Sequence, residues 1–268
     1  MAFASSNGAR IHYEVIDATS PWIESPETLI LQHGIGADPD MWRTWLPALI
    51  DRYRIVITDL RGYRRSVSSA PGPSWTLANL SDDVIAVADA MGLETFHLLG
   101  ESIGGTIALD CAVRYPARVA RLIVSNGGHV GSSIERVQAW QKQLDDLGVR
   151  AWSDEFMQQR FHADALDPVQ RAWYASRQEG WSPEAIMNPL RVLVGTDLRP
   201  VLDRIVCPTL IMHPDGSPFI PVEIAVDLHR RLPSSRLQVF AHSRHGLPFS
   251  HADACARLVR QFLDDDLA

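Results

Sequence analysis

A serine between two glycines carries the first chemical signal in the sequence. Ser102 lies in the stretch Gly-Glu-Ser-Ile-Gly from Gly100 to Gly104, after an apolar run and before a helical pattern. A serine on such a strand-to-helix turn has its hydroxyl lifted above the sheet, and the glycines relieve crowding in the turn. The helix start also aims the N–H of Ile103 at a developing negative charge. We interpret Ser102 as a nucleophile and Ile103 as an oxyanion-hole donor.

A histidine near the end of the chain is the candidate base. His245 follows the last strand-like run and precedes the final helical pattern. Its imidazole could take the Ser102 proton during attack on an acyl carbon. Two neighbouring histidines fit this role less well. His242 would end the strand, and His251 would begin the helix, where a polar cap explains it.

Short apolar runs separated by helical patterns must position these residues. The runs predict strands buried on both faces of a parallel sheet. They cover residues 28–32, 55–59, 96–100, 121–125 and 209–213, with a weaker run at 237–240. Strands that alternate with helices predict a doubly wound α/β sheet, with its site at the carboxyl ends of the strands.

One long segment interrupts this alternation. Residues 127–200 contain no buried-strand run but carry four of the eight tryptophans. We interpret the segment as a helical cap over a pocket, inserted into a core domain formed by residues 1–126 and 201–268. From its aromatic residues we select three as substrate-binding: Trp140, Trp152 and Phe161. The alternative is that most of these aromatics form the cap's own small core.

Over nearly its whole length the chain resembles the α/β-hydrolase superfamily. His33-Gly-Ile-Gly36 is similar to the family's HGxG turn, and Trp42 matches an aromatic that often follows it. The stretch from Asp59 to Ser66 resembles the family's D-x-R-G-x-G-x-S loop, although Arg64 stands where glycine is usual. The turn at Gly100–Gly104, here called the elbow, and the cap pattern are most similar to the group of 3-oxoadipate enol-lactonases and small esterases.

The resemblance has consequences for the fold and the site. It implies the α/β-hydrolase fold, with a mostly parallel doubly wound sheet and a helical cap inserted after the sixth strand. It also implies that the N–H of Ile35 is the second oxyanion-hole donor. The chain order of Ser102 and His245 agrees with the family's order of serine, acid and histidine.

The acid of the expected triad is not evident. The resemblance implies a carboxylate after the seventh strand or at the end of the sixth, and these positions hold Ser217 and Asn126. We take Asp215, on the same loop as Ser217, as the catalytic acid. Alternatively, Asn126 or Ser217 merely accepts the hydrogen bond of the histidine, or Ser102 is not an efficient nucleophile. Glu101 and Glu223 are weaker candidates for the acid.

Composition limits the partners. Lys and Arg number 25 against 32 Asp and Glu, a net charge of −7, which argues against nucleic acid and acidic membrane surfaces. The three cysteines form no ligand cluster and the histidines are dispersed, so we expect no metal and no other cofactor. No leader or membrane-length apolar run is evident, which predicts a cytoplasmic protein. The expected partner is a small-molecule substrate, and a homodimer is compatible with the sequence.

Together these features predict a serine hydrolase for a small ester or lactone with an apolar body. Two other classes stay open. The first is a C–C bond hydrolase or a cofactor-free oxygenase-type enzyme on the same fold. The second is a ligand-binding protein with weakened catalysis, because neutral residues occupy both usual acid positions.

Overall fold

A single mixed sheet runs through the molecule. The computed structural model describes residues 2–66, 75–132 and 137–265, and these residues form an eight-stranded sheet in the order β1-β2-β4-β3-β5-β6-β7-β8. The strands are β1 Ala2–Ser6, β2 Ala9–Ile16, β3 Thr28–Gln32, β4 Arg54–Thr58, β5 Phe96–Glu101, β6 Val119–Ser125, β7 Thr209–Pro214 and β8 Ser235–Phe240. Strand β2 runs opposite to the other seven strands, so it is antiparallel to both of its neighbours, β1 and β4. The other described strand pairs are parallel. All six predicted strand runs, including the weaker one, are confirmed.

Helices cover both faces of this sheet. They are η1 Pro39–Trp45, α1 Leu46–Leu49, α2 Leu77–Ala90, α3 Ile103–Arg114, α4 Val137–Arg160, α5 Pro168–Glu179, α6 Pro183–Val194, η2 Leu202–Arg204, α7 Val222–Arg231, α8 Leu247–Ser250 and α9 Ala252–Asp264. Ile30 of β3 packs into one core with α2, α3 and α7. Its neighbours Leu29 and Leu31 pack into a second core with η1, α1 and α9. Because successive strand side chains point to opposite faces, a wholly apolar run is needed to fill both cores.

Local signals set the ends of the helices. Thr76 caps α2, because its hydroxyl accepts a hydrogen bond from the N–H of Asn79 at 3.1 Å. Gly92 follows the end of the same helix with φ 66°, the left-handed conformation that glycine adopts without strain. In α5, Asp167 and Gln170 form a capping box. Among the described helices, none is long and apolar enough to cross a membrane.

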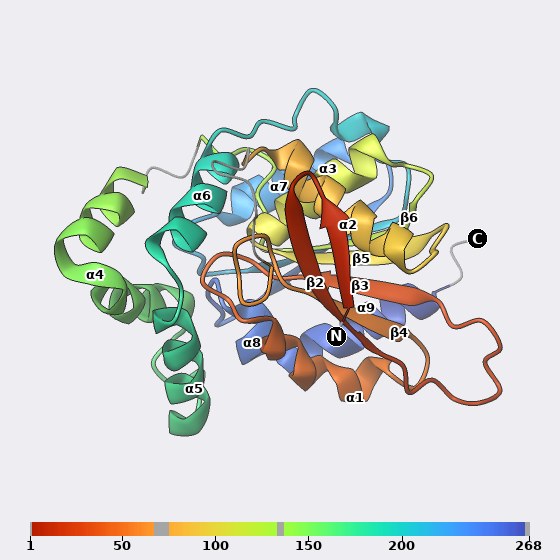
Figure 1. Cartoon of the computed structure of the whole chain (residues 1–268), viewed down its shortest axis with the longest axis horizontal. Coiled ribbons are helices and arrows are strands. Elements are labelled where there is room, and N and C mark those ends of the chain that lie inside the picture. The colour runs from red at the N-terminus through yellow and green to blue at the C-terminus, as the bar shows by residue number, and fades with distance from the viewer. Residues whose placement is uncertain (1, 67–74, 133–136, 266–268) are drawn as a thin grey trace.

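In the described part of the segment between β6 and β7, the regular elements are mainly helices, as the sequence predicts. Figure 1 shows α4, α5 and α6, here called the cap helices, grouped at one side of the molecule. Helix α4 bends at Gly148, whose φ of 78° lies outside the helical region. The assignment of these helices to a cap inserted into residues 1–126 and 201–268 stays a prediction.

Candidate active site

The turn between β5 and α3 places Ser102 in a strained backbone conformation. Its φ of 57° and ψ of −121° are unusual for a residue with a side chain. The two glycines beside it are sterically required. A Cβ at Gly100 would collide with the backbone of Gly104, and a Cβ at Gly104 would collide with the backbone of Gln32. The predicted sharp turn is therefore present, and it holds the Ser102 hydroxyl at the carboxyl end of β5.

The structure brings Ser102 and His245 together. The Nε2 atom of His245 lies 3.0 Å from the Oγ atom of Ser102, although 143 residues separate them. The imidazole is buried and meets the ring of Phe219 edge to face, with centroids 4.9 Å apart. Burial, with the nearby Arg160 guanidinium and the imidazole of His213, holds the pKa of His245 well below its ordinary value. His245 is therefore neutral at pH 7 and able to accept a proton.

A serine hydroxyl, and not a carboxylate, faces the other nitrogen of this imidazole. The Oγ atom of Ser217 lies 3.2 Å from Nδ1 of His245. The same oxygen accepts hydrogen bonds from the N–H groups of Phe219 at 3.4 Å and Ile220 at 3.2 Å. Ser217 thus occupies the position that a triad acid would take, but it carries no negative charge.

The expectation that Asp215 reaches His245 is not met. Its two carboxylate oxygens accept hydrogen bonds from the backbone N–H groups of His242 at 2.8 Å and Ser243 at 3.0 Å. Although burial opposes the effect, these hydrogen bonds keep the pKa of Asp215 below its ordinary value. The structure therefore does not bring Asp215 to Nδ1 of His245, because its carboxylate closes the turn of the loop that carries His245, here called the histidine loop.

Asn126 does not orient the imidazole either. Its side-chain amide donates to the backbone oxygen of His245 at 2.8 Å and to Oε1 of Glu101 at 3.3 Å. Its own oxygen accepts from the hydroxyl of Ser125 at 2.7 Å. Asn126 therefore holds the backbone of the histidine loop.

The loop after β3 carries the second expected oxyanion donor, Ile35. Its conformation depends on His33, whose Nε2 accepts from the N–H of Leu60 at 2.9 Å. The Nδ1 atom of His33 must then carry the proton and donates to the carbonyl of Gly34, also at 2.9 Å. Burial lowers the pKa of His33 to about 4, so this tautomer persists at neutral pH. Sequence reasoning read His33 only as part of a motif and missed this role.

The helix after the elbow carries the first expected donor. Ile103 is the first residue of α3, where no preceding helical turn supplies a carbonyl for its N–H. This amide is adjacent to the nucleophile in the chain, and Ile35 lines the same cavity as Ser102. Their use as an oxyanion hole stays a prediction.

A small apolar cavity of about 20 Å³ lies over Ser102 and His245. Its other lining residues are Ile35, Trp140, Phe156, Leu190, Leu193, Phe219 and Ile220. The volume is close to that of one water molecule. Of the three predicted substrate-binding aromatics only Trp140 lines it. Sequence reasoning named Ile35 as an oxyanion donor but selected none of the remaining lining residues. Of these, Phe156 carried a signal, because it lies in the same aromatic segment as Trp140.

The other two predicted aromatics have packing roles. Trp152 meets Trp140 at a centroid distance of 5.5 Å and stacks on Phe156 at 4.6 Å. Phe161 meets the ring of Tyr174 at 5.0 Å and leaves no room for a Cβ at Gly246. Trp152 belongs to the same buried cluster as Trp140 and Phe156, whereas Phe161 belongs to the second buried cluster, with Tyr174 and Phe249. Both therefore pack in a core, which is close to the alternative that the sequence left open.

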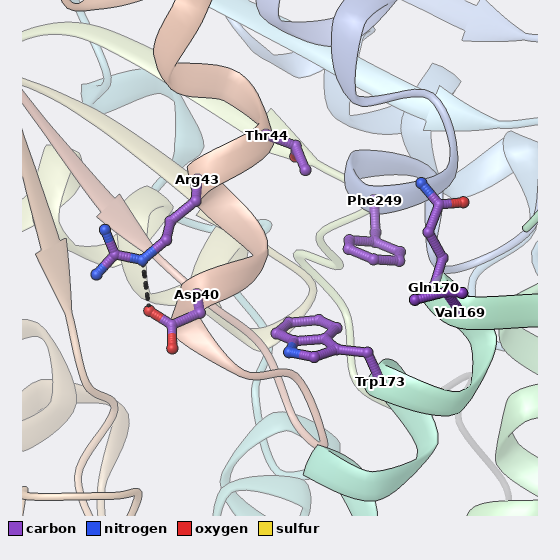
Figure 2. Close-up of a pocket in the computed structure, with 7 residues that line it drawn as sticks. All are labelled: Asp40, Arg43, Thr44, Val169, Gln170, Trp173 and Phe249. Atoms are coloured by element: carbon purple, nitrogen blue, oxygen red, sulfur yellow. Dashed lines mark hydrogen bonds and ion pairs between the residues drawn. The ribbon is translucent and has the colours of Figure 1, made fainter. Parts of the chain in front are cut away.

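A larger hollow of about 380 Å³ lies between η1, α5 and α8. Figure 2 shows it, with Asp40 and Arg43 paired on one wall and Trp173 and Phe249 on the other. These two rings stack with centroids 5.5 Å apart. Neither Ser102 nor His245 lines this hollow, so its size does not describe the reaction site.

Comparison with known proteins agrees with this fold. A family model described as alpha/beta hydrolase fold matches residues 27–192. A protein from Caulobacter sp. (strain K31) that is named as the carbamate hydrolase RutD is 27% identical, over 90% of this chain and 92% of its own. A 2-hydroxy-6-oxononadienedioate/2-hydroxy-6-oxononatrienedioate hydrolase from Comamonas testosteroni is 28% identical, over 88% and 87%. The crystal structure of an enol-lactonase from Burkholderia xenovorans LB400 superposes with a TM-score of 0.90 at 23% identity, over 98% of this chain and 100% of that one.

Proposed function

Because the chain belongs to the alpha/beta hydrolase fold family, we propose that it is a serine hydrolase that cleaves a small carboxylic ester or lactone. The observation that carries this proposal is the 3.0 Å contact between Ser102 Oγ and His245 Nε2. The contact lies at a small apolar cavity, directly after a strand and before a helix. This is the arrangement that a serine nucleophile and its base require.

The reaction proceeds in two halves. His245 Nε2 takes the proton of Ser102 as Oγ attacks the acyl carbon, and the N–H groups of Ile35 and Ile103 stabilise the oxyanion. The bond to the leaving group breaks as His245 returns the proton to the departing oxygen, which leaves an acyl group on Ser102. A water molecule, deprotonated by His245, then attacks this acyl group, and Ser102 recovers its proton as the carboxylic acid departs.

The neutral residue at Nδ1 limits this mechanism. Ser217 can hold the imidazole ring in place, but it does not stabilise the imidazolium that forms during attack. Burial and the charge of Arg160 also disfavour the imidazolium. We therefore expect the enzyme to prefer activated esters and lactones, whose leaving groups depart without strong proton donation.

The cavity defines the acyl part of the substrate. A space of about 20 Å³ with an apolar wall favours the shortest acyl groups, and acetyl, which is larger than one water molecule, enters only as the lining side chains move apart. Three of its lining side chains carry a polar atom: Ser102, His245 and the indole of Trp140. The other lining side chains are apolar. The charged and amino groups of a carbamate would lose their hydration there without compensation. An ester or lactone therefore fits this cavity better than the carbamate in the name of the Caulobacter relative.

A panel of p-nitrophenyl esters with acyl chains of increasing length tests the proposal, together with a fluorophosphonate probe. Wild-type protein should take up the probe and hydrolyse the acetate faster than the longer esters, and Ser102→Ala should do neither. Carbamate, assayed by ammonia release, and a vinylogous C–C substrate serve as the comparison arms. The proposal fails if wild type is not labelled, if Ser102→Ala labels equally, or if only a comparison substrate is turned over.

A further inference from the structure

A fully buried arginine connects the cap helices with the loops around Ser102. Arg160 is the last residue of α4 and has no exposed surface. Its Nη2 donates to the carbonyl of Ile35 at 2.7 Å, and its backbone oxygen accepts from the N–H of Gly246 at 2.8 Å. Its Nη1 donates to the hydroxyl of Tyr174 at 2.6 Å and lies 3.5 Å from Oε1 of Glu101. One residue thus contacts the loop of Ile35, the residue before Ser102 and the residue after His245.

The distances show that ion pairing is not the main contact of this guanidinium. Arg160 makes shorter hydrogen bonds to Ile35 and Tyr174 than to Glu101. The carboxylate of Glu101 likewise makes its shorter bond elsewhere, with Oε2 accepting the N–H of Gly34 at 2.8 Å. The two charges therefore act on the same loop from two sides, one on the N–H of Gly34 and one on the carbonyl of Ile35.

The amide of Ile35 lies between these two anchored groups. The peptide that follows it is held at both ends, by Arg160 on the Ile35 carbonyl and by the hydroxyl of Tyr63, 3.0 Å from the N–H of Gly36. The peptide that contains the Ile35 N–H is held through the Gly34 carbonyl by His33. With both neighbouring peptides held, the direction of the Ile35 N–H is set before substrate arrives.

We propose that Arg160 is a positioning residue that, together with Glu101, aims the N–H of Ile35 at the developing oxyanion. This inference rests on the proposed function, because it requires Ile35 to be an oxyanion donor. The guanidinium also stacks on the ring of Phe156 at 4.7 Å, and Phe156 lines the cavity. Arg160 therefore supports both the donor and the wall that faces the acyl group. Lysine could not replace it, since a single ammonium cannot reproduce hydrogen bonds in several fixed directions.

A set of variants separates positioning from stability. Arg160→Met should lower kcat for p-nitrophenyl acetate by about 10- to 100-fold, with KM changed less than about threefold, because an oxyanion bond strengthens in the transition state. It should also lower the thermal midpoint, since Glu101 is left buried without its countercharge. The double variant Arg160→Met with Glu101→Gln removes that charge and should recover much of the thermal midpoint. Its kcat should stay at least about tenfold below that of Glu101→Gln alone, because the Ile35 carbonyl still lacks its donor.

A second buried pair provides the matched control. Arg61 has no exposed side-chain surface and holds Asp83 with bonds of 2.6 and 2.8 Å, and neither residue lines the cavity over Ser102. Arg61→Met with Asp83→Asn should change stability but not kcat per folded molecule. The inference is overturned if Arg160→Met keeps wild-type kcat, or if its double variant regains the kcat of Glu101→Gln. Wild-type protein without Ser102-dependent turnover would instead overturn the proposed function, and this inference with it.

Discussion

At the scale of single residues, the partner of His245 decides how strong a catalyst the site can be. Ser217 lies next to Nδ1 of His245 but carries no charge. The charged carboxylate of Asp215 instead accepts hydrogen bonds from the backbone N–H groups of His242 and Ser243. Loss of the triad aspartate in a serine protease costs about 10⁴-fold in kcat. With a hydroxyl at this position, kcat should therefore be lower than with a carboxylate.

Ser217→Asp should raise kcat. The new carboxylate would lie next to Nδ1 and would meet the N–H groups of Phe219 and Ile220, which now donate to the Ser217 oxygen. Stabilising the imidazolium should increase kcat for p-nitrophenyl acetate by about tenfold or more. Ser217→Ala, the companion variant, should lower kcat by less than about tenfold, because no charge is lost. A folded Ser217→Asp protein with unchanged or reduced kcat would contradict this role.

The pH dependence of kcat/KM follows from the lowered pKa of His245. Only the neutral imidazole accepts the Ser102 proton, so activity is present above this pKa and disappears as the pH falls through it. Burial, Arg160 and His213 lower the pKa, and the acidic limb should lie below pH 6.5, the ordinary value for histidine. A pH profile of the acetate ester measures it, and Ser217→Asp should move the limb upward. A wild-type limb at or above pH 6.5 would be inconsistent with the buried site.

At the scale of elements, helix α4 matters because it delivers Arg160, Phe156 and Trp140 to the site. The helix changes direction at Gly148, where φ is 78° and a Cβ added to the glycine would meet no heavy atom within 4 Å. The glycine is thus needed for its backbone conformation and not for space. The bend sets the direction from which the C-terminal half of α4 reaches the Ile35 loop.

Gly148→Ala should destabilise the protein by about 1–3 kcal/mol, because residues with a side chain hardly ever adopt the φ of 78° and ψ of 175° found at this position. Gly180→Ala provides the control, since Gly180 has an ordinary φ of −79° at the end of α5, and a Cβ there would approach the Arg177 carbonyl oxygen at 3.3 Å. Chemical denaturation of both variants gives the comparison. Equal stabilities would show that the bend at Gly148 carries no conformational cost.

At the scale of the whole molecule, the reaction site is a junction between the sheet and the cap helices. Ile35 and Ser102 follow the carboxyl ends of the central strands β3 and β5, and His245 lies on the loop after β8. Helices α4 and α6 supply much of the cavity wall. The volume available to substrate is therefore set by how the cap helices pack and not by any one element.

Leu190→Ala should widen the cavity and change the acyl preference. Leu190 of α6 lines the cavity, so removing its side chain should raise kcat/KM for the butyrate ester relative to the acetate ester by about tenfold. The control is Leu144→Ala, because Leu144 is a buried residue of α4 that does not line the cavity. Both variants should lose about 2–5 kcal/mol of stability. An unchanged ester preference in Leu190→Ala would argue against this cavity as the acyl site.

Local patterns along the chain were enough to predict the parallel sheet, the turn at Ser102 and the approach of His245. Apolar runs bounded by polar loops and glycines at fixed offsets are local signals, and they need no knowledge of distant contacts. The turn between β1 and β2 is local in origin too, since Asn7 and Gly8 both adopt positive φ there, a conformation that an Asn-Gly pair adopts readily.

The folded structure alone determines which side chains surround the reacting atoms of Ser102 and His245. Asp215 and Ser217 lie two residues apart on one loop, and the backbone N–H groups of His242 and Ser243 determine which of them is left to face His245. In the same way, Trp140 lines the cavity while Trp152 lies behind it. The contact between Arg160 and Ile35 joins residues 125 positions apart. Such choices depend on packing between distant segments, and no local pattern in the chain encodes them.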